Sequence, residues 1–182
     1  MMRLTLVEPS LQYKDAYIEM IEEWKRTGEN MTPFVLRFEY EDFDGMLIKL
    51  QQLKERLLED ENKVNSTTLW LLEDGTRIAG AVNIRHRLND YLQEIGGHIG
   101  YGVRPSSRRK GYATEMLKQA LQYARTLGLR KVLVTCDKDN VGSARTIVNN
   151  QGVLDSEAVV HGVEIQRYWI EISLLQREDG VT

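Results

Sequence analysis

A short basic turn is the part of this sequence whose residue types point most directly to chemistry. Residues 103–114 run from an apolar, strand-like segment into an amphipathic helix. The turn contains Arg108, Arg109, Lys110, Gly111 and Ala113. The start of the helix would offer unpaired N–H groups and the positive end of the helix dipole, and Gly111 would let the backbone approach an anion closely. The pattern predicts a phosphate-binding turn, although charge alone would also fit a basic surface turn.

The spacing within this turn resembles a known signature. Arg108-x-x-Gly111-x-Ala113 is similar to the Arg/Gln-x-x-Gly-x-Gly/Ala acyl-CoA signature of the GNAT superfamily of N-acyltransferases, and Val103-x-Pro105 precedes it as in that family. The strand–turn–helix context supports the match. The resemblance implies acetyl-CoA as co-substrate. The cofactor-binding residues that it implies in this turn are Val103, Arg108, Arg109, Lys110, Gly111, Tyr112, Ala113 and Thr114.

A second segment that resembles the family begins where a β-branched strand ends. Asn140 follows that strand, and Ser143 lies on the next predicted helix. In GNAT proteins an Asn at this place commonly contacts the acyl-CoA, with a Ser or Ala three residues on. The resemblance therefore implies that Asn140 and Ser143 help to bind the cofactor. Asn140 is also a good N-cap for a helix that starts near residue 141, and the two roles are compatible.

Acetyl transfer to an amine needs a base, because an amine is mostly protonated at neutral pH. His98 is the first candidate, since it precedes the phosphate turn on a central strand and histidine titrates in the right range. Glu94 is the second candidate, either directly or through a water molecule. The alternative for His98 is a purely structural histidine in the strand. A backbone N–H within residues 99–101 is expected to stabilise the oxyanion.

The leaving thiolate needs a proton or at least a hydrogen bond. Many GNAT enzymes place a Tyr on the helix after the Asn, but Ile147 occupies that position here, seven residues after Asn140. Tyr101, Tyr168 or water could substitute, or the thiolate could leave unassisted. The departure keeps a second interpretation open: a catalytically inactive GNAT-fold protein that binds acyl-CoA and acts as a sensor or partner.

The segment 83–92 is a candidate for the acceptor pocket, because it is dense in polar groups between two predicted strands. Asn89 or Asp90 could hold the amine, and the alternative is a solvated loop. Glycines follow it in the next strand, and such glycines often mark a bulge or the close approach of another chain. The glycines that fit entry of the pantetheine arm are Gly96, Gly97, Gly100 and Gly102.

The periodicity of the chain predicts the elements that position these residues. Strands are expected at residues 3–7, 68–72, 78–84, 97–103, 131–136, 153–160 and 164–172, with an Asp-Gly turn at 73–76. Helices are expected after a Pro9-Ser10 cap and at 41–58, 109–127 and 141–150. Residues 34–38 are ambiguous, and 86–94 form a polar connection.

Hairpins at both ends of this order indicate a mixed sheet. The expected fold class is α+β, and the order is similar to the GNAT fold over nearly the whole chain. That resemblance implies a central mixed, mostly antiparallel sheet flanked by about four helices, with a splayed parallel pair at 97–103 and 132–136. The length of 182 residues predicts a single domain, residues 1–182.

Composition restricts the function further. A net charge of −3 and a pI near 5.7 argue against general nucleic-acid binding. No apolar run approaches the ~18–20 residues that a membrane span needs. The single cysteine, Cys136, fits a reducing cytoplasm, and the three scattered histidines indicate no metal site.

These observations predict a cytoplasmic N-acetyltransferase that moves an acetyl group from acetyl-CoA to a primary amine. The amine would attack directly in a ternary complex. The acceptor would be a small molecule, or an amine on a protein terminus or lysine. GNAT relatives are often dimers, so the resemblance also implies a homodimer as a possible assembly.

Overall fold

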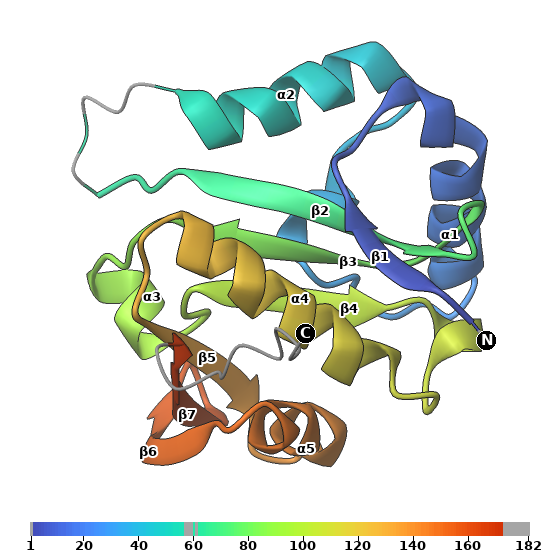
Figure 1. Ribbon diagram of the computed structural model, residues 1–182. Coiled ribbons are helices and arrows are strands. Elements are labelled where there is room, and N and C mark those ends of the chain that lie inside the picture. The colour runs from blue at the N-terminus through green and yellow to red at the C-terminus, as the bar shows by residue number, and fades with distance from the viewer. Residues whose placement is uncertain (1, 57–59, 61, 173–182) are drawn as a thin grey trace, which may run out of the picture.

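The computed structural model describes residues 2–56, 60 and 62–172 (Figure 1). These residues form a four-stranded antiparallel sheet of order β1-β2-β3-β4 and a three-stranded antiparallel sheet of order β5-β7-β6. The strands are β1 (Leu4–Val7), β2 (Ser66–Glu73), β3 (Arg77–Arg85), β4 (Ile99–Val103), β5 (Lys131–Asp137), β6 (Val153–Val160) and β7 (Val163–Glu171).

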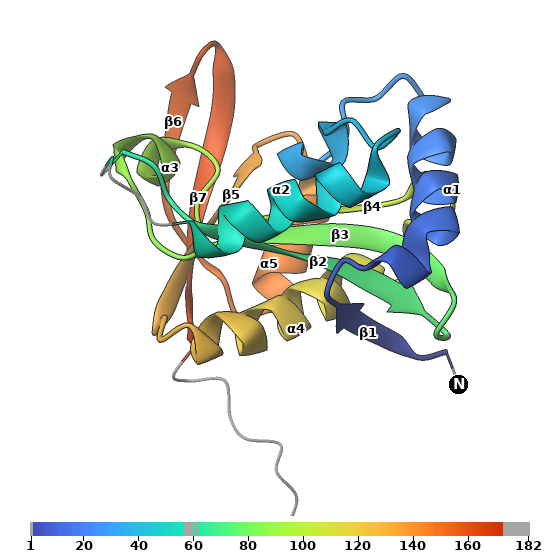
Figure 2. The ribbon, with the colours of Figure 1, turned by 90° about the horizontal axis from the view of Figure 1, so that it is seen from above.

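The helices connect and cover these sheets. The α-helices are α1 (Lys14–Lys25), α2 (Phe43–Glu55), α3 (Asp90–Glu94), α4 (Tyr112–Thr126) and α5 (Val141–Asn149). Three short 3-10 helices accompany them: η1 (Leu11–Tyr13), η2 (Phe34–Arg37) and η3 (Pro105–Ser107). Figure 2 shows α2 and α4 on opposite sides of the larger sheet. We call these two sides the α1/α2 face and the α4 face.

Alternation along the strands gives each face its own apolar core. In β2, Leu69 and Leu71 belong to the core that includes α4, whereas Trp70 and Leu72 belong to the core beneath α1 and α2. In β4, Ile99 and Val103 pack on the α4 face. Gly100 and Gly102, which alternate with them in β4, therefore face the α1/α2 side.

β4 and β5 are neighbours that do not form a ladder. The helix α4 connects them, and in Figure 1 both strands run in the same general direction and separate toward their C-terminal ends. The α+β class and the mostly antiparallel sheets are confirmed, and the gap between β4 and β5 lies where the splayed pair was expected. Five α-helices are present among the described residues, where about four were predicted.

Two of the predicted elements start later than expected, and both shifts involve backbone with positive φ. The helix expected at 109–127 begins at Tyr112, because Arg109 and Gly111 have φ of 59° and 80°, outside the helical region. The strand expected at 97–103 begins at Ile99, because Gly97 has φ of 59°.

Other boundaries differ by a few residues. The ambiguous segment 34–38 forms η2, and the connection 86–94 contains the short helix α3. The helix expected at 41–58 ends at Glu55, and its predicted residues 57 and 58 lie outside the described residues. The last strand is Val163–Glu171 rather than 164–172.

The sequence analysis assigned the glycines around β4 to entry of the pantetheine arm. Two of them instead make room for the protein's own backbone. A Cβ on Gly97 would collide with the carbonyl oxygen of Leu133, and one on Gly102 would collide with the carbonyl oxygen of Thr32. The close approach is therefore made by β5 and by the loop before η2. At these two positions the absence of a side chain lets those segments pack against β4 and its entrance.

Candidate active site

The gap between β4 and β5 is closed at one end by His98, the residue just before β4. Its backbone N–H donates to the carbonyl of Leu133 over 2.7 Å, and the N–H of Leu133 donates to Nδ1 of the His98 ring over 2.9 Å. The imidazole takes the place that a strand carbonyl would have in a regular ladder. Beyond this point no strand pairing joins the two sheets within the described residues.

One row of β4 peptide groups faces this gap. The N–H of Arg85 donates to the carbonyl of His98, and the N–H of Arg104 donates to that of Ala79, so the even-numbered positions bond to β3. The peptide groups turned toward the gap are those of Ile99, Tyr101 and Val103. An extended ligand with amide groups could pair with this edge as an added strand does.

The turn after β4 presents backbone N–H groups that have no acceptor in the described part of the chain. Arg109 and Gly111 have positive φ, and α4 starts directly behind them. None of the N–H groups of residues 109–114 has a partner there, whereas that of Glu115 bonds back to the carbonyl of Gly111. Such N–H groups before a helix N-terminus make an anion-binding concavity. The geometry fits a phosphate or pyrophosphate.

The side chain of Arg108 anchors this turn. Its Nη1 and Nη2 donate to the two carboxylate oxygens of Glu29 over 2.9 and 2.6 Å, and its Nε donates to the carbonyl of Val103 over 3.1 Å. The guanidinium also lies 5.4 Å from the ring centre of Trp24. The hydrogen bond to Glu29 raises the pKa of Arg108. The exposed cations beside the unpaired N–H groups are Arg109 and Lys110.

Several of the predicted cofactor residues have side chains that point away from the turn. Tyr112 is buried, and its hydroxyl donates to Oε1 of Glu73 over 2.7 Å; burial, together with this bond, raises its pKa to about 12. Val103 is buried in the α4-face core, while Ala113 packs at its edge. The carbonyl of Thr114 accepts a hydrogen bond from Asn150, which follows α5. At Tyr112 the backbone N–H, rather than the side chain, faces the turn.

A buried arginine that the sequence analysis did not single out holds the turn to α1. Arg104 is 2% exposed and donates to Glu23 and to Glu19. The N–H of Ser106 donates to Glu23 over 2.8 Å. Burial alone would raise the pKa of Glu23, but the hydrogen bonds from Arg104 and Ser106 outweigh it and lower that pKa to about 2. Because the partners are 81 residues apart, no local pattern could have revealed the pair.

The start of α5 lies across the gap from β4. Oδ1 of Asn140 accepts the N–H of Ser143 over 3.0 Å, so the predicted N-cap is present. The Tyr101 hydroxyl lies 2.8 Å from Oγ of Ser143. Burial raises the pKa of Tyr101 to about 12, despite the opposing hydrogen bond to Ser143, so its phenol is protonated at neutral pH. The structure thus brings Asn140, Ser143 and Tyr101 together.

The other positions considered for the leaving-group acid lie differently. Ile147 is fully buried in the α4-face core and carries no proton to donate. The hydroxyl of Tyr168 donates to Oε1 of Gln166 over 2.8 Å. Tyr101 is the candidate whose hydroxyl reaches the first turn of α5.

Comparison with known proteins agrees with this geometry. Residues 3–150 match the family model described as an acetyltransferase (GNAT) domain. The chain belongs to the GNAT acetyltransferase family. No curated protein sequence matches it significantly.

Solved structures confirm the GNAT fold. The microcin C7 self-immunity acetyltransferase MccE, in complex with acetyl-CoA and AMP, is similar with a TM-score of 0.63 and 18% identity, over 92% of both chains. A dodecameric spermidine N-acetyltransferase from Vibrio cholerae has a TM-score of 0.62 and 13% identity, over 98% of both chains. A GNAT-family acetyltransferase from Streptococcus pneumoniae has a TM-score of 0.60 and 16% identity, over 94% of this chain and 99% of that one.

The ring of His98 in this GNAT protein is held by a hydrogen bond from the backbone. Because Nδ1 accepts the Leu133 N–H, the neutral ring carries its proton on Nε2, which leaves no free lone pair in the plane of the ring. Burial, with a smaller contribution from the Arg85 charge, lowers the His98 pKa to about 4. His98 is therefore neutral at pH 7 and holds β5 against the start of β4.

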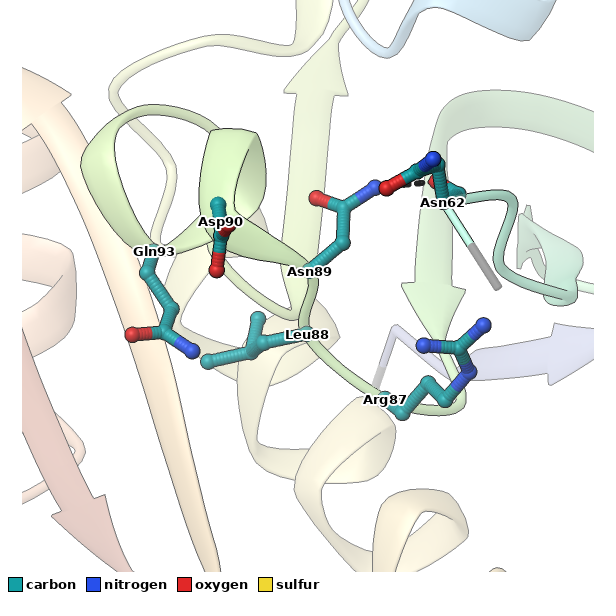
Figure 3. A pocket seen from close by; sticks show the side chains of 6 residues that line it. All are labelled: Asn62, Arg87, Leu88, Asn89, Asp90 and Gln93. Atoms are coloured by element: carbon teal, nitrogen blue, oxygen red, sulfur yellow. Dashed lines mark hydrogen bonds between the residues drawn. The ribbon is translucent and has the colours of Figure 1, made fainter. Parts of the chain in front are cut away.

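The segment 83–92 divides into a buried half and an exposed half. Figure 3 shows an open polar hollow lined by Asn62, Arg87, Leu88, Asn89, Asp90 and Gln93. Oδ1 of Asn89 accepts the N–H of Leu92 and its Nδ2 donates to the carbonyl of Asn62, so this side chain fixes the start of α3. Asp90 and Glu94 are exposed on α3. The structure thus places Glu94 on the surface, at the end of the helix that leads into β4.

Within the described residues, no group of three or more His, Cys, Asp or Glu side chains could hold a metal ion. In the same part of the chain, no helix has the length and apolar character that crossing a membrane requires.

Proposed function

We propose that this GNAT protein transfers the acetyl group of acetyl-CoA to a primary amine by direct attack in a ternary complex. The observation that carries the proposal is the run of N–H groups at residues 109–114 that find no acceptor in the described part of the chain, next to the unpaired edge of β4. The first feature fits a pyrophosphate, and the second fits an arm that contains amides. A co-substrate that carries both a pyrophosphate and an amide-containing arm would occupy the turn and the β4 edge together.

The turn and α5 would hold the two ends of acetyl-CoA. The N–H groups of residues 109–114 would bind the pyrophosphate, with the exposed Arg109 and Lys110 adding charge. Asn140 and Ser143 would flank the arm where it enters the gap. When bound, acetyl-CoA would supply a thioester carbon that an amine can attack.

The edge of β4 would orient the reaction. The neutral amine nitrogen forms a bond to the thioester carbon, and the carbon–sulfur bond then breaks to release the thiolate. A backbone N–H turned into the gap, at Ile99 or Tyr101, would stabilise the charge on the oxygen. Because His98 lacks a free lone pair, we place loss of the amine proton on water and on Glu94, whose carboxylate is exposed.

Tyr101 would act on the leaving group. Its protonated hydroxyl lies by the first turn of α5, in the gap through which the arm would pass. With a pKa of about 12 it is a weaker acid than an ordinary thiol, whose pKa is about 8.5. Tyr101 would therefore donate a hydrogen bond to the thiolate, and water would supply the final proton.

Isothermal titration with acetyl-CoA, with free CoA as control, tests the proposal. We expect saturable binding in the micromolar range, followed by thiol release when amines are added. A folded protein that does not bind acetyl-CoA would overturn the proposal. Binding without thiol release for any class of amine would favour the catalytically inactive sensor instead.

A further inference from the structure

An apolar cavity of about 360 Å³ lies beside the entrance to β4. Its walls come from η2, the end of α2, the ends of β2 and β3, and the α3 region, and they include Phe34, Leu53, Arg85, Leu92 and Ile95. No Asp or Glu is among the lining residues that the structure describes. The volume lies at the lower end of the range for pockets that hold small ligands, about 300–1,000 Å³.

Arg85 connects this cavity to the reacting edge of β4. A Cβ on Gly100 would lie 3.3 Å from Nη1 of Arg85, so the guanidinium covers the middle of β4 on the α1/α2 face. The residues on either side of Gly100, Ile99 and Tyr101, turn their peptide groups into the gap. A ligand group held by Arg85 would therefore lie next to the site proposed for acetyl transfer.

The charge of Arg85 has no carboxylate partner within the described residues. Its Nη1 donates to the carbonyl of Gly96 over 3.0 Å, and its guanidinium lies 5.8 Å from the ring centre of Phe34. No hydrogen bond from its Nη2 or Nε is present there. Burial leaves this cation poorly solvated and so lowers its pKa. A guanidinium in such a place binds a carboxylate strongly, because the fork of N–H groups matches the two oxygens.

The surroundings make a polycation a poor occupant. A further cation lies by the end of α3, since Nε of Arg167 donates to the carbonyl of Glu94. A polyamine would bring further positive charges to Arg85, and the lining residues that the structure describes offer no buried carboxylate to receive them.

We propose that the acceptor is a small amine that also carries a carboxylate and an apolar side chain, as an apolar α-amino acid does. Arg85 binds the carboxylate, and the apolar walls formed by Phe34, Leu92 and Ile95 receive the side chain. Because amine and carboxylate share one carbon, the amine then lies beside the edge of β4. This assignment rests on the proposed acetyl transfer and names the acceptor class of the same site.

Binding of the product type tests the assignment without requiring turnover. N-acetyl-L-phenylalanine and N-acetyl-L-phenylalaninamide differ only in the carboxylate, and both can be titrated calorimetrically into the CoA-loaded protein. We expect the acid to bind at least tenfold more tightly than the amide to the wild type. Arg85→Gln should remove this preference, and Arg85→Lys should keep part of it.

Arg37→Gln is the matched control, because Arg37 is an exposed cation on η2 that bonds Asn30 and does not line the cavity. It should keep the full preference for the acid. Thermal unfolding and the acetyl-CoA titration establish that each variant is folded and loaded. In thiol-release assays, L-phenylalanine should exceed both its amide and spermidine as acceptor.

Three outcomes would overturn the assignment: equal binding of acid and amide, an unchanged preference in Arg85→Gln, or preferential acetylation of spermidine. Each of these leaves acetyl-CoA binding intact and therefore leaves the proposed acetyl transfer standing. Loss of acetyl-CoA binding in the wild type would instead remove both proposals together.

Discussion

In the proposed mechanism, the hydroxyl of Tyr101 takes a role that the family resemblance gives to a residue on another element. The leaving-group tyrosine that the family resemblance places on α5 is replaced by the buried Ile147. A hydroxyl reaches the same helix from β4, however, through the contact between Tyr101 and Ser143. A tyrosine hydroxyl can thus reach this gap from β4, just as one on α5 could.

Tyr101→Phe should lower kcat while leaving acetyl-CoA affinity nearly unchanged. The variant removes one hydrogen bond to a developing charge, worth about 1.5–3 kcal/mol, which corresponds to about 10- to 160-fold in rate. Steady-state kinetics and calorimetry measure the two quantities separately. Tyr168→Phe is the control, because its hydroxyl bonds to Gln166 on β7. An unchanged kcat in Tyr101→Phe would exclude this role.

His98 can be tested with a pair of variants. His98→Ala leaves the Leu133 N–H without its acceptor, which should cost about 1–3 kcal/mol in the free energy of unfolding. His98→Asn offers an oxygen near the place of Nδ1 and should retain most of the stability and activity. The pH profile of kcat/KM should keep its form in His98→Asn. A folded His98→Asn that loses activity and the limb of that profile near neutral pH would show that His98 is the base after all.

At the scale of elements, binding at the proposed phosphate turn would depend on backbone shape more than on the charges of the turn. The side chain of Arg108 is committed to Glu29 and Val103, and that of Tyr112 to Glu73. What faces outward is a series of N–H groups whose direction follows from positive φ at Arg109 and Gly111. The sequence motif is therefore better understood as a way to shape the turn than as a set of binding side chains.

Gly111→Val should weaken acetyl-CoA binding without unfolding the protein. Gly111 has φ of 80°, and no atom lies within 4 Å of the position that a Cβ would take there, so the substitution meets strain rather than collision. Strain of this kind is about 1–2 kcal/mol, which the turn can relieve by changing shape. Calorimetry should show at least a tenfold loss of affinity.

Gly128→Val supplies the matched control for this variant. Gly128 follows α4, has φ of 84° and is equally open. Gly128→Val should lower the free energy of unfolding, measured with urea, by about as much as Gly111→Val does. It should leave acetyl-CoA affinity unchanged. Equal losses of affinity in the two variants would show that general destabilisation, and not the shape of the turn, explains the effect.

The elements were largely predictable, because their signals are local. The amphipathic repeat of α4 and the Asn140 cap of α5 both depend on residues close in the chain. Their ends were harder to predict where a residue other than glycine adopts positive φ, as Arg109 does. Side-chain type gives little indication of such a conformation, since the surrounding turn imposes it.

At the scale of the whole molecule, the unpredicted features are contacts between distant segments. The His98 ring bonds to Leu133, the Arg85 guanidinium covers Gly100, and Arg104 joins the turn to α1. Each depends on how sheets and helices pack, so a pattern along the chain cannot reveal it. The same contacts decide which residues remain available for chemistry. They commit His98 to the backbone, while Arg85 keeps donors that no described residue accepts.

The link between Arg104 and Glu23 should make the stability of the whole protein depend on pH. The Glu23 pKa falls from an ordinary 4.5 to about 2 in the folded protein, so the folded state binds this proton less tightly than the unfolded state. Its contribution is therefore complete above about pH 4.5 and is lost as the pH falls toward 2. Glu23→Gln should destabilise the protein at pH 7, and the difference from wild type should shrink below about pH 4.5.

Urea unfolding at several pH values between 3 and 7 measures this difference, and Glu19→Gln is the control. Glu19 bonds to the same Arg104, but its side chain is 65% exposed. Its removal should therefore have a smaller effect on the free energy of unfolding at pH 7, because water screens the charge of an exposed carboxylate. A Glu23→Gln difference that stayed constant down to pH 3 would contradict the lowered pKa. The turn would then be held to α1 by packing around Arg104 rather than by the ionised pair.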